Sequence, residues 1–139
     1  MNIRIERFVT HVSGGLIVLL FTVSCHKNLE ERAEREARQY TEQCCPTPIV
    51  NFTRTDSVVF DRSTRTYHYF CSVSGRMDNA AVIKANQNSI MNSLRESIIQ
   101  DTSIKAYKDA GFRFAYTLHS TLQPDSVYFH AEFGPKDYQ

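Results

Sequence analysis

Two histidines and a glutamate near the end of the chain are residue types that bind metals or move protons. His119 and His130 flank a turn centred near Pro124, and Glu132 follows two positions later. Imidazole and carboxylate groups are common zinc ligands, so the trio would suit zinc if the fold brought it together. The spacing matches no close-spaced ligand signature. We therefore predict no metal site and no cofactor, and place these residues on a solvent-facing sheet.

A second constellation is a thiol with a histidine nearby. His68 precedes Cys71 by three residues, and a thiol beside an imidazole can act as a nucleophile. The surrounding residues alternate as in a β-strand, where positions three apart point to opposite faces. We therefore predict no catalytic residue and no enzyme. An enzyme with a surface His/Glu site is the alternative.

The cysteines raise the question of a disulfide. Cys44 and Cys45 are adjacent and rarely bond each other, which leaves Cys71 to pair with one of them in an oxidising compartment. Such a bond would contribute about 3 kcal/mol. Three small buried hydrophobic thiols are the alternative.

The apolar run before Cys25 decides the compartment. The chain opens with Arg4 and Arg7, and the strongly apolar stretch covers only residues 16–21, extended by Thr22 and Val23. A membrane span needs about 20 apolar residues, whereas a basic start, a short apolar centre and small residues at the end are typical of a signal peptide. We expect residues 1–24 to be cleaved.

Residues 1–25 resemble the precursor of a bacterial lipoprotein, in which a small residue precedes the cysteine that ends the lipobox. Ser24 and Cys25 occupy those places, although Thr22 stands where the family usually has an aliphatic residue. The resemblance implies cleavage between Ser24 and Cys25, diacylglycerol on the sulfur, and a fatty acid such as palmitate on the new amino group. Several acyl chains hold a small domain firmly to a bilayer. His26, in place of Asp, favours the outer membrane.

The charge balance excludes one class of partner. Cleavage removes two of the 16 basic and one of the 15 acidic residues, which leaves 115 residues with equal numbers of each sign. No basic block remains, so nucleic-acid binding and a polybasic contact with anionic lipid are not expected.

The periodicity then predicts the elements. Residues 25–45 read as the lipidated cysteine and a charged spacer helix with a narrow alanine stripe, for which a partner-binding helix is the alternative. Residues 46–139 read as one domain with the order α-β-β-α-β-β when that helix is included. We predict an α+β fold, in which a four-stranded antiparallel sheet carries its helices on one face. The segments are a hairpin around 61–65, an amphipathic helix in 77–100, a short helical turn in 101–111 and a hairpin around 122–126.

The uncovered face of this sheet is the candidate binding surface, with Phe70, Arg113, His119, Tyr128 and His130. The domain is similar in pattern to small exported bacterial proteins. We therefore expect a lipid-anchored protein of the cell envelope, at the outer membrane and facing the periplasm or the cell surface. It would act as a binding or assembly module for another envelope protein; a purely structural or inhibitor-like domain is the alternative.

Overall fold

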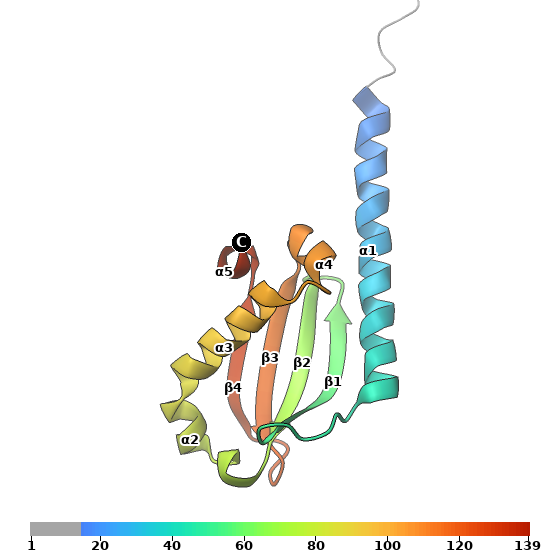
Figure 1. Cartoon of the computed structure of the whole chain (residues 1–139). Coiled ribbons are helices and arrows are strands. Elements are labelled where there is room, and N and C mark those ends of the chain that lie inside the picture. Colours follow the sequence, from blue (N-terminus) through green and yellow to red (C-terminus); the bar gives the residue numbers. More distant parts are fainter. Residues whose placement is uncertain (1–14) are drawn as a thin grey trace, which may run out of the picture.

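The computed structural model describes the backbone of residues 15–139 and the side chains of residues 28–139. Residues 1–14 of the expected signal peptide lie outside the described residues, and so do the side chains of Ser24 and Cys25. Among the described helices, none combines the length and apolar character that a membrane crossing requires. The elements (Figure 1) are α1 Gly15–Cys44, β1 Thr53–Asp61, β2 Thr66–Val73, η1 Gly75–Met77, α2 Ala80–Ala85, α3 Gln87–Gln100, α4 Lys105–Asp109, β3 Arg113–Ser120, β4 Val127–Phe133 and α5 Pro135–Tyr138.

The four strands form one sheet in the order β1-β2-β3-β4. The two hairpins are antiparallel, but β2 and β3 run parallel. The α+β class, the four strands and the order of helices and hairpins are confirmed. The expectation of a fully antiparallel sheet is wrong at its centre. A parallel pair needs a long crossover connection, and α2, α3 and α4 supply it.

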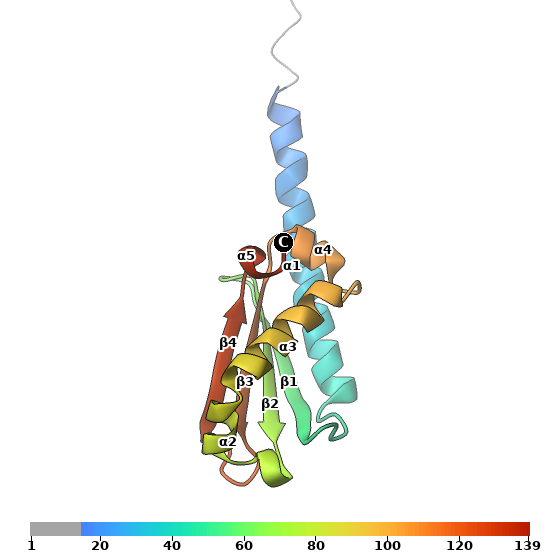
Figure 2. The same ribbon diagram turned by 60° about the vertical axis from the view of Figure 1, so that its left-hand side comes forward.

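Alternation divides the sheet into two faces. Tyr67, Phe114, Leu118 and Phe129 are buried on one of them, which we call the covered face because the helices pack there. The other face carries no helix of the described chain, and we call it the open face (Figure 2). The predicted amphipathic helix is present as α2 and α3, with Asn79 as the cap of α2 and a break at Asn86.

The second half of α1 differs from the predicted spacer, because it is part of the domain. Ala33 and Ala37 are buried in the core, and the Tyr67 hydroxyl donates to the Ala33 carbonyl at 3.3 Å. The Thr41 hydroxyl accepts from the Val58 N–H at 2.7 Å and donates to the Val58 carbonyl at 2.8 Å. Thr41 therefore occupies hydrogen-bonding groups of the edge strand β1. The small alanines let the helix approach closely, which a count of large apolar residues does not reveal.

Candidate functional site

A cavity of about 360 Å³ lies on the covered face, between α1 and the connection from α3 to α4. Helix α1 packs along β1, and α2 and α3 pack against β4, so the covered side of β2 is left partly open there. This volume is at the lower end of the range found for ligand sites. We call the cavity the tyrosine groove; it is lined by Glu36, Ala37, Tyr40, Val58, Tyr67, Tyr69, Ser103, Ile104 and Tyr107.

Packed aromatic rings order the floor of the groove. Tyr67 packs against Tyr107 at 5.3 Å and Tyr69 against Tyr116 at 4.8 Å between ring centroids. At one end, the Tyr107 hydroxyl donates to Glu36 Oε2 at 2.5 Å, and Arg32 donates to the other oxygen of that carboxylate at 2.7 Å. These contacts hold the α1 wall and the α4 wall together across the groove.

The groove is aromatic and neutral along its floor and has the ion pair of Glu36 and Arg32 at that end. Burial raises the pKa of Tyr67, Tyr69 and Tyr116, so their hydroxyls stay protonated. Burial also acts to raise the pKa of Glu36, but hydrogen bonds from Tyr107 and Arg32 outweigh it and hold the pKa below 4.5. The arrangement offers apolar contact area and a fixed carboxylate.

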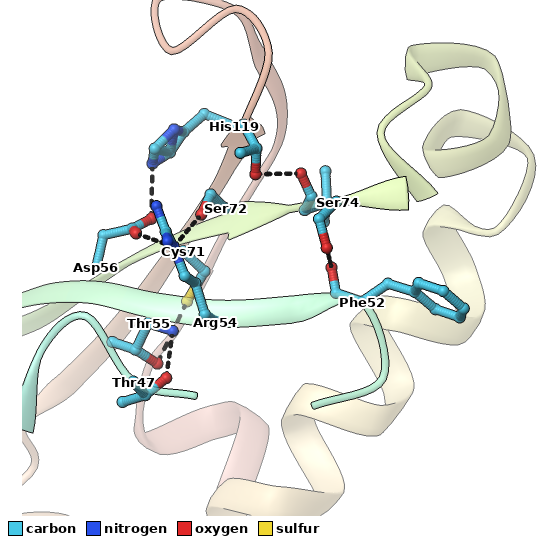
Figure 3. A network of polar contacts seen from close by, with 11 residues as sticks. Thr47, Phe52, Arg54, Thr55, Asp56, Cys71, Ser72, Ser74 and His119 are labelled. Carbon is cyan, nitrogen blue, oxygen red and sulfur yellow. Dashed lines mark hydrogen bonds and ion pairs between the residues drawn. The ribbon is translucent and has the colours of Figure 1, made fainter. Parts of the chain in front are cut away.

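A second group of interest is the polar cluster of the open face, which consists of Arg54, Asp56, Ser72 and His119 (Figure 3). A β-bulge positions it: Thr55 pairs with Cys71 and Ser57 with Phe70, so Asp56 is the extra residue. Bulges commonly re-aim a side chain in this way. Arg54 Nε lies 2.8 Å from Asp56 Oδ1 and 3.1 Å from Ser72 Oγ, and His119 Nε2 lies 3.2 Å from Asp56 Oδ2.

The polar cluster does not have the connections of a hydrolytic triad. Ser72 and His119 are neighbours in the β2–β3 register, but the serine hydroxyl accepts from Arg54. The imidazole approaches Asp56 through Nε2, and its Nδ1 is buried without a hydrogen-bond partner. A serine nucleophile needs a histidine in hydrogen-bond reach that a carboxylate orients from the far side. Within the cluster, the charges of Arg54 and Asp56 instead compensate each other.

The candidate zinc ligands have three different partners. His119 contacts Asp56, His130 Nδ1 lies 3.0 Å from Thr117 Oγ1, and Glu132 pairs with Arg113. No cluster of three histidine, cysteine or acidic side chains among the described residues has a geometry suited to a metal ion.

The predicted binding surface is only partly assembled. Phe70, stacked on His68 at 6.2 Å, shares the open face with Arg113, His119 and His130. Tyr128 is displaced by a second bulge, because Leu118 pairs with Phe129 while His119 pairs with Val127. Tyr128 packs against the core, and Val127 takes the place beside His119.

The three cysteines whose side chains the structure describes are unbonded. Cys44 is exposed, Cys45 is half-buried and Cys71 is buried on the covered face, where Thr55 Oγ1 lies 3.9 Å from its sulfur. The bond between Cys71 and Cys44 or Cys45 stays a prediction. His68 lies on the opposite face of β2, as the alternation predicted.

Sequence reasoning did not find the tyrosine groove. The strand alternation did place Tyr67 and Tyr69 on one face, which is a usable signal. Tyr40 and Tyr107 come from helices whose positions over the sheet are not encoded in any local pattern. No local pattern indicates that the covered side of β2 is left partly open between α1 and the connection from α3 to α4.

Two solved structures share the fold. A Pseudomonas aeruginosa protein described as secreted has a TM-score of 0.68 and 14% identity, and the match covers 81% of this chain and 94% of that one. The pilotin of the Vibrio vulnificus type 2 secretion system has a TM-score of 0.61 and 8% identity, with the same coverage. At these identities the similarity establishes the fold alone.

A comparison with curated proteins finds no match. Residues 28–129 match a protein family described as "Domain of unknown function (DUF8479)". This range includes the docked half of α1, the sheet up to the middle of β4 and the crossover helices. The match extends over well more than half of the chain, and the protein therefore belongs to the DUF8479 family.

Proposed function

We propose that the protein is a lipid-anchored assembly module of the bacterial cell envelope, which binds an apolar segment of an envelope protein in the tyrosine groove. The observation that carries the proposal is the partly open covered side of β2, where aromatic side chains line a cavity of about 360 Å³. The shared fold with a secretion-system pilotin and with a protein described as secreted supports an envelope role.

The groove has the composition of a recognition site. Tyrosine provides a large apolar body with a polar tip, and tyrosines are common among residues that dominate binding energy. The hydroxyl of Tyr69 makes no hydrogen bond within the described part of the chain, so it is available to a partner in the groove. The Glu36–Tyr107 bond joins the two walls before any ligand arrives, which lowers the entropy cost of binding.

The lipid anchor would place the domain beside the membrane. Leu29 already packs against the core, only four residues after Cys25. Four residues span at most about 14 Å even when fully extended, so a lipid at Cys25 would hold Leu29 within about that distance of the membrane surface. Lipidation is tested by globomycin, which blocks removal of lipoprotein signal peptides: precursor should accumulate, and the mature protein should carry diacylglycerol at Cys25. Unchanged processing would contradict the anchor but not the groove.

The groove is tested by site-specific photocrosslinking in intact envelopes. A photoreactive residue at Tyr40, in the groove, should capture one protein partner, whereas the same residue at Gln39, the exposed neighbour on α1, should not. Equal capture at both positions would contradict the proposal.

The captured segment then provides a quantitative test. As a synthetic peptide it should bind the wild-type chain, and Ile104→Glu should weaken binding at least roughly tenfold by placing a carboxylate in the apolar wall. Leu122→Glu makes the same chemical change at a side chain that is 82% exposed outside the groove, and it should leave binding unchanged. Circular dichroism establishes that both variants are folded.

A further inference from the structure

The two edges of the sheet differ in how their backbone groups are paired. On β1, the Thr41 side chain bonds the N–H and the carbonyl of Val58, and Thr47 does the same for Thr55. Both residues of β1 belong to pairs whose backbone groups point away from β2. The middle of the outer edge of β1 is therefore already hydrogen-bonded within the chain.

The outer edge of β4 has no such partner. The Arg113 N–H donates to the residue that precedes β2, and backbone groups alternate along a strand, so those of Phe114 point to β4. Phe114 pairs with Phe133, and alternation then leaves the N–H and carbonyl groups of His130 and Glu132 pointing outward. Within the described part of the chain, no hydrogen bond reaches these outward groups.

The sequence of β4 also lacks common means of protecting an edge strand. Natural edges are often shielded by lysine, by proline or by a bulge. Val127–Phe133 contains neither lysine nor proline, and its bulge at Tyr128 precedes the regular part of the strand. His130 and Glu132 are exposed, so a ligand can approach this edge from the open face.

We infer that an extended segment of a partner protein binds along β4 as a fifth strand of the sheet. Backbone groups at strand spacing are recognised by another extended backbone, which is the principle of β-augmentation. A segment alongside Phe129–Phe133 would bond the outward groups of His130 and Glu132. The site is separate from the tyrosine groove, because β4 and α1 lie at opposite edges of the sheet (Figure 1).

The side chains of β4 define the chemistry of the segment. Glu132 is the only charged residue of the strand, and Arg113 flanks its carboxylate from β3. A basic residue of the segment would take the other flank, since opposite charges on neighbouring strands attract. Beside Ala131, the side chain of the segment would point to the covered face, where Phe129 and Phe133 are buried, so an apolar residue fits there.

A second copy of this chain is a poor occupant of the edge. Two β4 strands would pair about a two-fold axis in antiparallel fashion, and the two α1 helices would then point in opposite directions. If Cys25 carries a lipid, as proposed above, the two anchors could not enter the same membrane. The segment therefore belongs to a different protein.

Two matched probes test the charge preference. One is a labelled heptapeptide that alternates threonine with valine and has lysine in one threonine position; the other has glutamate there. Fluorescence anisotropy with the full chain in a mild detergent should show the lysine peptide binding at least about threefold more tightly. Glu132→Lys should reverse this preference, whereas Glu42→Lys, the same charge change at an exposed position of α1, should leave it unchanged.

Amide hydrogen exchange tests the backbone pairing in the same samples. The amides of His130 and Glu132 should exchange rapidly in the free chain and more slowly with the lysine peptide bound. The Val58 amide, which Thr41 holds, should exchange slowly in both states. Glu132→Pro removes one outward N–H without touching the hydrogen bonds to β3, and it should weaken the binding of both peptides.

Four results would overturn the inference. They are no binding at about 1 mM peptide, a charge preference that Glu132→Lys leaves unchanged, unchanged exchange of the His130 and Glu132 amides, and loss of peptide binding in Ile104→Glu. The last would place the peptide in the groove. Protection of the two amides that rises with the concentration of the chain alone would identify a second copy as the occupant and overturn it as well. The groove proposal stands or falls separately, because none of the edge variants alters a residue of the groove.

Discussion

The covered face and the open face of the sheet are built from the same four strands but are stabilised in different ways. On the covered face, large apolar side chains such as Phe114 and Phe133 are fully buried under the helices. On the open face, polar and charged side chains pair across neighbouring strands, as Arg113 does with Glu132. The covered face therefore carries most of the folding free energy, and the open face contributes little beyond compensating its own charges.

The two faces also differ in the space that they leave open. The covered face has a cavity where helices are missing, above β2, and its lining there is aromatic. On the open face the charges of Arg54 and Arg113 are paired with carboxylates, and two β-bulges decide which side chains this face presents. The covered face therefore offers apolar contact area, whereas the open face presents charges that are already paired.

The largest predicted contrast between the faces is the effect of truncating one side chain on each. Phe114→Ala should lower the free energy of unfolding by about 3–5 kcal/mol, because it leaves a cavity in the core. Val59→Ala, on the open face, should change it by no more than about 0.5 kcal/mol. Urea unfolding at micromolar concentration measures both. Similar losses would mean that the open face is not the weaker side.

The docking of α1 on the covered side can be tested at Thr41. Thr41→Val keeps the shape but removes both hydrogen bonds to Val58, whose backbone would then lack partners, and should cost about 1–3 kcal/mol. Thr41→Ser retains the hydroxyl and is the matched control. If the valine and serine variants were equally stable, the helix would not be occupying the edge of β1 as described.

A smaller effect is expected from the charge pairs of the open face. Glu132→Gln should cost at most about 1 kcal/mol, because the pair with Arg113 is partly exposed. High salt should reduce the difference further. A loss well above this limit, measured by urea unfolding with and without added salt, would show that the open face contributes more than its exposure implies.

The smallest effect concerns the carboxylate at the end of the groove, and it depends on pH. The pKa of Glu36 is below its ordinary value of 4.5, so the ionised side chain stabilises the fold above that pH. This stabilisation is lost as the pH falls through the lowered pKa. The stability difference between wild type and Glu36→Gln should therefore be present at neutral pH and disappear in acid. Glu42→Gln, an exposed change on the same helix, controls for the loss of one charge.

Local patterns were enough to predict the four strands and the amphipathic helix between the hairpins, and to predict which face of the sheet most strand residues point to. Asp78 and Asn79, short polar residues before an amphipathic run, are both candidate helix caps, and in the structure Asn79 accepts from the free backbone N–H groups at the start of α2. The alternation correctly placed Cys71 and His68 on opposite faces. The direction of β3 relative to β2 was not accessible, because the crossover between them is long enough for either arrangement.

The candidate sites were less predictable for identifiable reasons. A bulge adds one residue to a strand without changing the appearance of the sequence, so Tyr128 was assigned to the wrong environment and Asp56 was not recognised beside His119. The docked half of α1 was missed because its contact stripe is mostly alanine, whose small size contributes through close approach and little through hydrophobic area.

By itself, the sequence determined the α+β class, the hairpins and the inside–outside alternation, because each depends on residues close together in the chain. The tertiary structure alone decided the parallel pairing, the packing of α1 on β1, the polar cluster and the tyrosine groove. Each of these depends on where elements distant in the chain come to rest, and on whether the space between two helices is filled.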